Sequence, residues 1–260
     1  MKTSFDLILP VYRPKPGWEL NSAKHLAAIQ QTCREADIPL TVYLVNDGSE
    51  EKEYFSPAVL DTFRAAVDRF RFLSYMPTGG KGYALRYGVS HSGGDIQIYT
   101  DCDFPFGAES ILDAYRLLDK GTEVVMGLRP GNYTAGLKPF RRILSLGIRC
   151  MNRLLLGLPS RYLDAQAGLK GFRGKGKHAF LMTEINTYLF DTEFILIAWR
   201  NHLKIDVVPL QLRENLDFSR MGFKVLFCEL CALARIFWNC RIGSSVIRRM
   251  EKAVEKEQKP

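Results

Sequence analysis

Short apolar runs alternate with longer stretches of helical periodicity over the first 130 residues of the chain. Strands are expected within FDLILPVY, LTVYLVNDGS, FRFLSYM, DIQIYTDCDF and TEVVMGLRP, and helices at 19–36, 57–70, 108–119 and behind the glycines of GGKGYALRYGVSHS. This alternation predicts the α/β class, with a mostly parallel central sheet flanked by helices. Ligands of such sheets bind beyond the carboxyl ends of the strands. The residues expected to line that edge are Asp47, the glycines near 80, Asp101, Asp103 and Arg129.

Length and composition fit one large domain. The chain has 260 residues, of which 47% are hydrophobic, enough for one sizeable core or a core with a small appendage. We expect a main domain over 1–221 and a helical extension with a charged tail over 222–260. The formal net charge of +8 favours anionic partners such as nucleic acid, acidic lipid or phosphate-bearing small molecules. The six cysteines show no disulfide framework, which favours a reducing cytosol.

No segment has the pattern of a signal peptide or a membrane span. The N-terminal apolar run is broken by Pro10, and the apolar stretch 225–240 is interrupted by Glu229 and Arg235. The stretch 138–158 places apolar residues on one helical face and basic residues mostly on the other. It predicts either a surface helix on the core or a helix resting on an anionic membrane surface. We therefore expect a soluble or peripheral protein.

Two carboxylates, Asp101 and Asp103, stand one residue apart at the end of an apolar run. An EF-hand calcium loop is excluded, because its sixth position would be Phe106 and its twelfth Leu112 instead of Gly and Glu. Two interpretations remain open from these residues alone. The pair belongs to an ordinary turn, or it binds Mg²⁺ or Mn²⁺ together with water and the phosphates of a nucleotide.

Two other segments have residues that could contact a nucleotide. TGGKGYALRYG is not a P-loop, because Gly82 follows the lysine where Ser or Thr is required. It predicts either a glycine-rich helix start or a loop in which the backbone approaches a ligand and Lys81 adds a positive charge. VNDGS consists of turn-forming residues. Asp47 within it is either a turn residue or an acceptor of hydrogen bonds from a base or ribose.

Seven segments, in this order, resemble the family 2 glycosyltransferases, and among them the branch of dolichol-phosphate mannose synthases and dolichol-phosphate glucosyltransferases. The segments are LPVYRP, VNDGS, GGKGYALRYGVSHSGGD, TDCDFPF, VVMGLRP, LDAQAGLKGF and YLFDTEFILIA, and the resemblance runs over about residues 5 to 220. It implies the glycosyltransferase-A type of α/β fold, with residues 1–221 as the catalytic domain.

The resemblance also implies a role for each matching residue. Contacts to the nucleotide-sugar are implied for Pro10, Tyr12, Asp47, Lys81 and Asp101. Asp101 and Asp103 match the residues that bind the divalent ion, Mg²⁺ or Mn²⁺, and Cys102 between them is expected to pack. Arg129 matches an arginine near the acceptor phosphate. Arg213, Ser219 and Arg220 approximate the basic segment of the lipid-phosphate branch, although their spacing departs from the family pattern. Acceptor contacts are therefore implied for Arg213 and Arg220 as well.

Enzymes of this family invert the anomeric carbon by direct displacement, so an alcohol acceptor needs a general base. The candidates are Asp164 in LDAQAGLKGF, which the family position favours, and Asp191 and Glu193 in FDTEF. Each has a structural alternative, because Asp164 can cap a loop and acidic residues are favoured in the first turn of a helix. A phosphate monoester is largely ionised at pH 7, so a polyprenyl phosphate acceptor would need little base catalysis.

The resemblance implies an inverting, metal-dependent glycosyltransferase that moves a hexose from a UDP- or GDP-sugar to a polyprenyl phosphate at a membrane surface. Two alternatives remain: the same donor chemistry onto a sugar hydroxyl of a growing glycan, and a basic nucleotide- or nucleic-acid-binding protein without catalysis. The acidic motifs argue against nucleic acid, because carboxylates repel phosphates unless a metal intervenes. The expected location is the cytoplasm, with peripheral contact to the cytoplasmic membrane face as an option.

Overall fold

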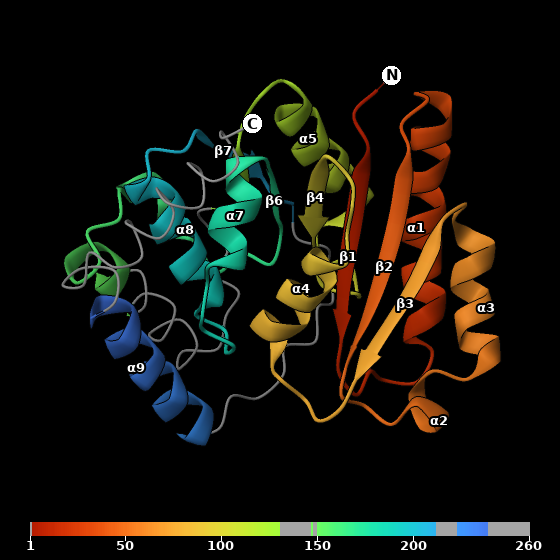
Figure 1. The fold of residues 1–260 in the computed structure, drawn as a ribbon, viewed down its shortest axis with the longest axis horizontal. Coiled ribbons are helices and arrows are strands. Elements are labelled where there is room, and N and C mark those ends of the chain that lie inside the picture. Colours follow the sequence, from red (N-terminus) through yellow and green to blue (C-terminus); the bar gives the residue numbers. More distant parts are fainter. Residues whose placement is uncertain (1, 131–146, 148–149, 212–222, 239–260) are drawn as a thin grey trace, which may run out of the picture.

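The core of the molecule is a seven-stranded sheet with the strand order β3-β2-β1-β4-β6-β5-β7 (Figure 1). The computed structural model describes residues 2–130, 147, 150–211 and 223–238. Its strands are β1 (Phe5–Val11), β2 (Leu40–Asp47), β3 (Phe70–Tyr75), β4 (Ile96–Tyr99), β5 (Val124–Leu128), β6 (Lys170–Arg173) and β7 (Ile205–Pro209). Among these described strands β6 alone runs antiparallel to its neighbours. The predicted α/β class with a mostly parallel sheet is therefore confirmed.

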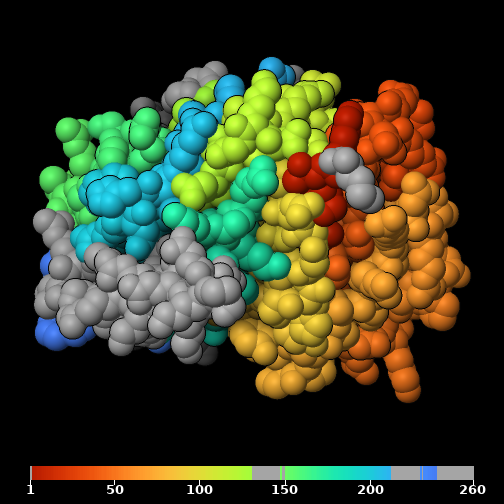
Figure 2. Space-filling model, turned by 45° about the horizontal axis from the view of Figure 1, so that its top comes forward, coloured from red at the N-terminus to blue at the C-terminus, as the bar shows by residue number. Residues whose placement is uncertain are grey.

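Helices cover both faces of this sheet. They are α1 (Trp18–Glu35), α2 (Glu51–Tyr54), α3 (Pro57–Ala66), α4 (Lys81–Ser90), α5 (Gly107–Asp119), α7 (Lys175–Leu181), α8 (Phe190–Arg200) and α9 (Phe223–Phe237), with a 3₁₀ turn at Ser160–Tyr162. One apolar cluster lies between the sheet and α1, α3 and α5, and the other lies between the sheet and α4, α7, α8 and α9. Figure 2 shows α4, in yellow, and α7, in blue-green, side by side on one face.

Strand β1 shows why the strands are almost continuously apolar in sequence. Leu7 and Leu9 pack into the cluster under α1, α3 and α5, whereas Ile8 between them packs into the cluster on the opposite face. All three side chains are completely buried. Because both faces of a parallel sheet are covered, successive residues must all be apolar, and the run indicates a strand without indicating a face.

Several elements differ from the sequence predictions. The helix expected at 57–70 ends at Ala66, because Val67 adopts an extended backbone and β3 begins at Phe70. Strands β6 and β7 were not predicted. Residues 150–154 of the expected amphipathic helix 138–158 are helical, but the chain leaves the helix before 158, and most of the remainder lies outside the described residues. The helix expected after 222 is present as α9 over Phe223–Phe237. Within the described ranges, no helix has the length and apolarity to cross a membrane.

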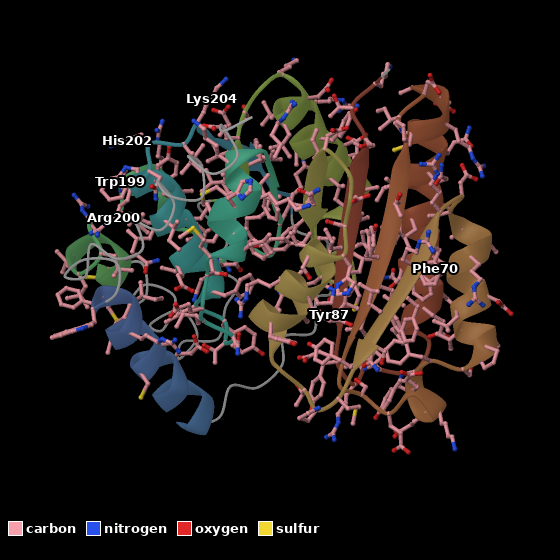
Figure 3. All side chains as sticks on the ribbon, in the orientation of Figure 1. Phe70, Tyr87, Trp199, Arg200, His202 and Lys204 are labelled. Carbon is pink, nitrogen blue, oxygen red and sulfur yellow. The ribbon has the colours of Figure 1, made fainter. Side chains whose placement is uncertain are left out.

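The carboxyl ends of the parallel strands meet along one edge of the sheet. Because β6 is antiparallel, it contributes its first residue, Lys170, to this same edge, where Lys170 pairs with Tyr99 of β4 and Met126 of β5. The turn after α8 lies elsewhere, toward the amino ends of the strands, as the labels of Trp199 and Lys204 show (Figure 3). The candidate site therefore lies where β1, β2, β4 and β5 end and β6 begins.

Candidate active site

A tight turn after β4 presents the two aspartates of the Asp-Cys-Asp segment. The backbone N–H of Phe104 donates to the carbonyl oxygen of Asp101 at 3.0 Å. Phe104 has a φ of 50°, is 1% exposed and stacks on His25, so it anchors the turn in the core. Asn21 donates to the carbonyl oxygen of Asp103 at 3.1 Å. The Asp101 side chain is 39% exposed and Asp103 is exposed, so both carboxylates lie at the solvent edge of the sheet.

Asp47, the last residue of β2, holds the glycine loop that precedes α4. Its Oδ1 accepts hydrogen bonds from the backbone N–H of Gly79 at 2.7 Å and of Gly80 at 3.2 Å, and from the Tyr75 hydroxyl at 2.6 Å. Burial and the bond to Asp47 raise the pKa of Tyr75, so its hydroxyl remains a donor. Gly80 has a φ of 89°, a conformation that glycine adopts readily. Asp47 thus orders the loop that leads to Lys81; its predicted nucleoside contact stays a prediction.

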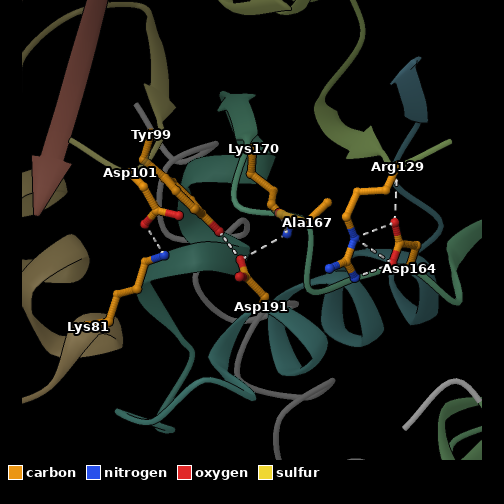
Figure 4. Close-up of polar contacts among 8 residues, drawn as sticks. All are labelled: Lys81, Tyr99, Asp101, Arg129, Asp164, Ala167, Lys170 and Asp191. Carbon is orange, nitrogen blue, oxygen red and sulfur yellow. Dashed lines mark hydrogen bonds and ion pairs between the residues drawn. The ribbon is translucent and has the colours of Figure 1, made fainter. Parts of the chain in front are cut away.

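Lys81, the first residue of α4, forms an ion pair with Asp101 (Figure 4). Its side chain is 24% exposed. Burial lowers the pKa of Lys81, but attraction to Asp101 and Asp191 outweighs this, so its pKa is raised and the ammonium keeps its charge. The structure therefore brings together two residues that the sequence separates by a helix and a strand.

The residues around Asp101 fit a divalent cation. Carboxylate oxygens are the ligands that Mg²⁺ and Mn²⁺ prefer, with water and phosphates completing the coordination. The Asp101 Oδ2 lies beside Gly168, where an added Cβ would come within 2.6 Å of it, so the absence of a side chain at Gly168 leaves room for this oxygen. No cluster of three His, Cys, Asp or Glu side chains arranged for a metal occurs in the described part of the chain. One or two carboxylates, with water and substrate phosphates as the other ligands, suffice for Mg²⁺ at a nucleotide site, and the turn presents two, those of Asp101 and Asp103.

Arg129, which follows β5, is paired with Asp164. The Arg129 Nε donates to Asp164 Oδ1 at 3.1 Å and to Oδ2 at 3.0 Å, Nη2 donates to Oδ1, and the backbone N–H donates to Oδ2 at 3.0 Å. The side chains are 14% and 3% exposed. The predicted acceptor-binding arginine and the predicted base therefore form one bidentate ion pair, a strong and geometrically specific contact.

Asp191 and Glu193 both lie buried in the first turn of α8. Asp191 Oδ1 accepts a hydrogen bond from the Tyr99 hydroxyl and lies 3.1 Å from the Nζ of Lys170. Glu193 faces a different segment: its Oε2 accepts from the backbone N–H of Glu184 at 2.9 Å and of Ile185 at 2.8 Å. Burial raises the pKa of Glu193. The structure brings Asp191, but not Glu193, next to the Lys81–Asp101 pair.

The end of β1 carries an exposed aromatic ring suited to stack on a base. Tyr12 is 48% exposed, and the guanidinium carbon of Arg13 lies 5.3 Å from the centre of its ring. Arg13 has a φ of 41°, and its backbone N–H donates to Ser49 Oγ at 2.9 Å, which ties this turn to the end of β2. Pro10 precedes this turn within β1. Arg213, Ser219 and Arg220 lie outside the described residues.

Sequence reasoning missed Lys170, the completely buried lysine that pairs with Asp191. A lysine next to a glycine in the short segment LKGF does not stand out as a core residue, since lysines are usually exposed. The signal that could have found it is its position, two residues after Gly168 and directly after the mostly apolar stretch Ala165–Leu169.

An α/β sheet with one antiparallel strand, an Asp-x-Asp turn and an edge lined by ion pairs is typical of a glycosyltransferase type of domain. The chain belongs to glycosyl transferase family 2, whose model matches residues 20–180. It is 28% identical over 217 residues to dolichyl-phosphate beta-glucosyltransferase ALG5A of Trichomonas vaginalis, covering 80% of this chain and 64% of that protein. It is 23% identical over 209 residues to dolichyl-phosphate beta-glucosyltransferase of Saccharomyces cerevisiae, covering 71% and 60%. The chain thus spans less than two thirds of the length of these relatives.

A solved structure confirms the fold. Glucosyl-3-phosphoglycerate synthase from Mycobacterium tuberculosis, in complex with Mn²⁺, UDP and glucosyl-3-phosphoglycerate, matches with a TM-score of 0.57 at 16% identity. The match covers 90% of this chain and 76% of that one. The glycosyltransferase-A type of fold that the sequence predicts is therefore confirmed.

Proposed function

We propose that this chain is an inverting, divalent-metal-dependent glycosyltransferase that moves a hexose from a nucleoside-diphosphate sugar to a polyprenyl, dolichyl-type phosphate at a membrane surface. The observation that carries the proposal is the shared edge of the sheet, where the Asp101 turn at the end of β4 and Arg129 at the end of β5 flank Lys170 (Figure 4). On one side, a divalent ion held by Asp101 and Asp103 would attract the donor diphosphate. On the other side, the guanidinium of Arg129 would attract the acceptor phosphate. The relatives named for dolichyl phosphate support this acceptor.

The donor side of the edge accounts for binding of a nucleotide-sugar. Asp101 and Asp103 would hold Mg²⁺ or Mn²⁺, and the ion, when bound, offsets the charge that develops on the departing diphosphate. Lys81 adds a cation next to Asp101. The exposed ring of Tyr12 would stack on the base, with Pro10 and Asp47 beside it. UDP and GDP donors both satisfy this arrangement.

The acceptor side favours a phosphate over a sugar hydroxyl. A hydroxyl acceptor requires a base, yet proton uptake by Asp164 would leave the nearly buried guanidinium of Arg129 without its counter-charge. A phosphate acceptor is already ionised, so it requires orientation and charge compensation instead. Arg129 would supply both while Asp164 fixes its direction. Arg213 and Arg220 would add basic contacts, and Asp191 would be the second carboxylate near the reacting atoms.

A transfer assay tests the proposal. Purified protein is incubated with Mn²⁺ or Mg²⁺ and radiolabelled UDP-glucose or GDP-mannose, with and without polyprenyl phosphate, and the products are extracted into organic solvent. Label in the organic phase only when lipid phosphate and metal are present is the expected result. Metal-dependent release of nucleoside diphosphate without organic label would instead direct attention to a glycan hydroxyl. Binding of nucleotide without any turnover would contradict an enzymatic role.

Two further measurements test the type of acceptor and the contact with a membrane. In the variant Asp164→Asn the amide oxygen can still accept a hydrogen bond from Arg129, and the phosphate of a lipid acceptor would supply the missing counter-charge. This variant should therefore retain most transfer to a lipid phosphate, from which no proton has to be removed, but should lose transfer to a hydroxyl. A severe loss with the lipid phosphate, in a folded variant, would count against this account. The proposal places the protein in the cytoplasm or on the cytoplasmic membrane face. Sedimentation with vesicles that contain anionic lipid tests the peripheral contact.

A further inference from the structure

Lys170 lies at the centre of the site and has no role in any of the contacts proposed above. It is the first residue of β6, the antiparallel strand between β4 and β5, and its side chain is completely buried. The strand topology places it midway between the Asp101 turn that follows β4 and Arg129 that follows β5 (Figure 4). A lysine at this point therefore places an amino group inside the molecule, directly between the donor side and the acceptor side.

The contacts of Lys170 are few and specific. Its Nζ donates to the carbonyl oxygen of Ala167 and lies 3.1 Å from Asp191 Oδ1. Burial lowers the pKa of Lys170 by more than the attraction to Asp191 raises it, so the pKa of this ammonium lies below its usual value. A buried ion pair of this kind adds little stability compared with apolar residues of the same volume. The pair is therefore better explained by what it positions than by the stability that it adds.

The charged side chains along this edge alternate in sign. Lys81 pairs with Asp101 and is also attracted by Asp191, and Lys170 is attracted by both Asp191 and Asp164. Asp164 in turn pairs with Arg129. The resulting order across the site is Asp101, Lys81, Asp191, Lys170, Asp164 and Arg129. Asp191 is thus the carboxylate that stands between the diphosphate side and the acceptor side.

Asp191 is held on one oxygen. Both the Tyr99 hydroxyl and the Lys170 ammonium contact Oδ1, and no described side chain or backbone N–H donates a hydrogen bond to Oδ2. A carboxylate held in this way has a fixed direction and one oxygen left for a ligand. A sugar that loses its diphosphate develops positive charge at the anomeric carbon, and a fixed negative charge nearby lowers the free energy of that state.

We propose that Lys170 is a positioning residue of the transfer reaction: with Tyr99 it fixes the Asp191 carboxylate beside the sugar, between the donor diphosphate and the acceptor. This inference rests on the proposed function, because it needs the sugar to lie between the Asp101 turn and Arg129. Lys170 itself, being completely buried, does not touch the substrate. It acts through the orientation and the charge of Asp191.

Four variants test the proposal: Lys170→Met, Asp191→Asn, the double variant, and Lys177→Met as a matched control. The Lys177 Nζ also donates to a backbone carbonyl, that of Ser92 at 3.0 Å, but it lies in α7 away from the site. We expect Lys170→Met to lower kcat by about 30-fold or more while the donor KM and the Kd for UDP with Mn²⁺ change less than about threefold. Lys177→Met should leave all three constants unchanged.

The double variant separates positioning from stability. Each single change leaves one buried charge without its partner, so both should lower the Tm, whereas the double variant removes both charges and should regain much of the Tm. If Lys170 acts through Asp191, kcat of the double variant stays as low as that of Asp191→Asn. If the Lys170–Asp191 pair has a purely structural role, kcat of the double variant should return together with its Tm. The double variant also provides the test if Lys170→Met fails to fold.

Three outcomes would overturn the proposal: a folded Lys170→Met protein with kcat within about threefold of wild type, recovery of kcat in the double variant, or a loss confined to UDP binding. Failure of the proposed function looks different. In that case wild-type protein transfers no sugar from any donor to any acceptor, while the Tm values of the four variants still report whether Lys170 and Asp191 are coupled.

Discussion

Replacing Gly168 by alanine tests the assignment of Asp101 as a metal ligand without removing any polar group. Gly168 stands two residues before β6, and its backbone is not among the glycines with positive φ, so alanine can adopt the same conformation. The new methyl group would lie 2.6 Å from Asp101 Oδ2 and 3.5 Å from its Cγ. The change therefore acts on the position of one carboxylate oxygen.

The size of the effect follows from these distances. Ordinary contact begins near 3.4 Å, so the Asp101 oxygen must move by roughly 0.8 Å. Because the displaced atom is the end of a side chain that is 39% exposed, we expect the free energy of unfolding to fall by no more than about 1 kcal/mol. A displacement near 1 Å at a reacting site costs on the order of 100-fold in rate. A tenfold weaker binding of UDP with Mn²⁺ would correspond to about 1.4 kcal/mol.

Isothermal titration with UDP in the presence of Mn²⁺ measures this effect directly, and thermal unfolding of the same samples measures the fold. Gly93→Ala is the control, because an added Cβ at Gly93 would meet nothing within 4 Å and its φ is not positive. We expect binding to weaken at least tenfold in Gly168→Ala and not at all in Gly93→Ala. A folded Gly168→Ala protein that binds UDP with Mn²⁺ as tightly as wild type would refute the role of Asp101.

Three further predictions concern metal, packing and pH. Excess EDTA should abolish UDP binding and added Mn²⁺ should restore it; binding unaffected by EDTA would contradict the metal site. Gly82→Ala should lower the free energy of unfolding by about 1–3 kcal/mol in urea, because its Cβ would meet the backbone of Ile185 and lie 2.9 Å from the Phe190 Cβ; an unchanged midpoint would show that the helix can shift. Burial raises the pKa of Asp6 above 3.8, so the stability that this group contributes is present at acidic pH and is lost as pH rises through its folded pKa. Asp6→Asn should therefore raise the Tm near pH 8 and lose this advantage near pH 4, whereas an equal difference at both values would contradict the assignment.

Strands β1 to β5 could be predicted from sequence because each is a mostly apolar run, and three of these runs lead into a distinctive polar residue. Asp47, Asp101 and Arg129 each directly end or follow such a run, and the structure places all three at the carboxyl edge. The antiparallel strand β6 could not be predicted in the same way, because it has only four residues, Lys170–Arg173, with a glycine inside. From the sequence, Lys170 is expected at the surface; only the topology shows that it lies between β4 and β5 and is buried.

The pairing of charges could not be predicted from sequence either. Asp164 and Arg129 were assigned separate roles, as base and as acceptor contact, because nothing local to either residue indicates the other. Their bidentate ion pair depends on how the loop before β6 returns to the end of β5. Similarly, the acidic start of α8 is visible in sequence, but only the fold shows that Asp191 turns toward Lys170 while Glu193 holds the backbone of 184–185.

The balance of charge at the edge links metal binding to nucleotide binding. Four carboxylates, those of Asp101, Asp103, Asp164 and Asp191, face three cations, those of Lys81, Arg129 and Lys170, so these seven groups carry one net negative charge. A diphosphate that approaches this edge without a metal is opposed by the carboxylates, and a divalent ion reverses the sign of the local charge. Each ligand should therefore raise the affinity for the other by the same factor, since coupling between two binding equilibria is reciprocal. The same balance explains how a chain with a net charge of +8 can have an acidic site, because the positive excess lies outside these seven residues. There the excess positive charge favours contact with an anionic surface, whereas the seven residues of the site select a diphosphate that is bound to a metal.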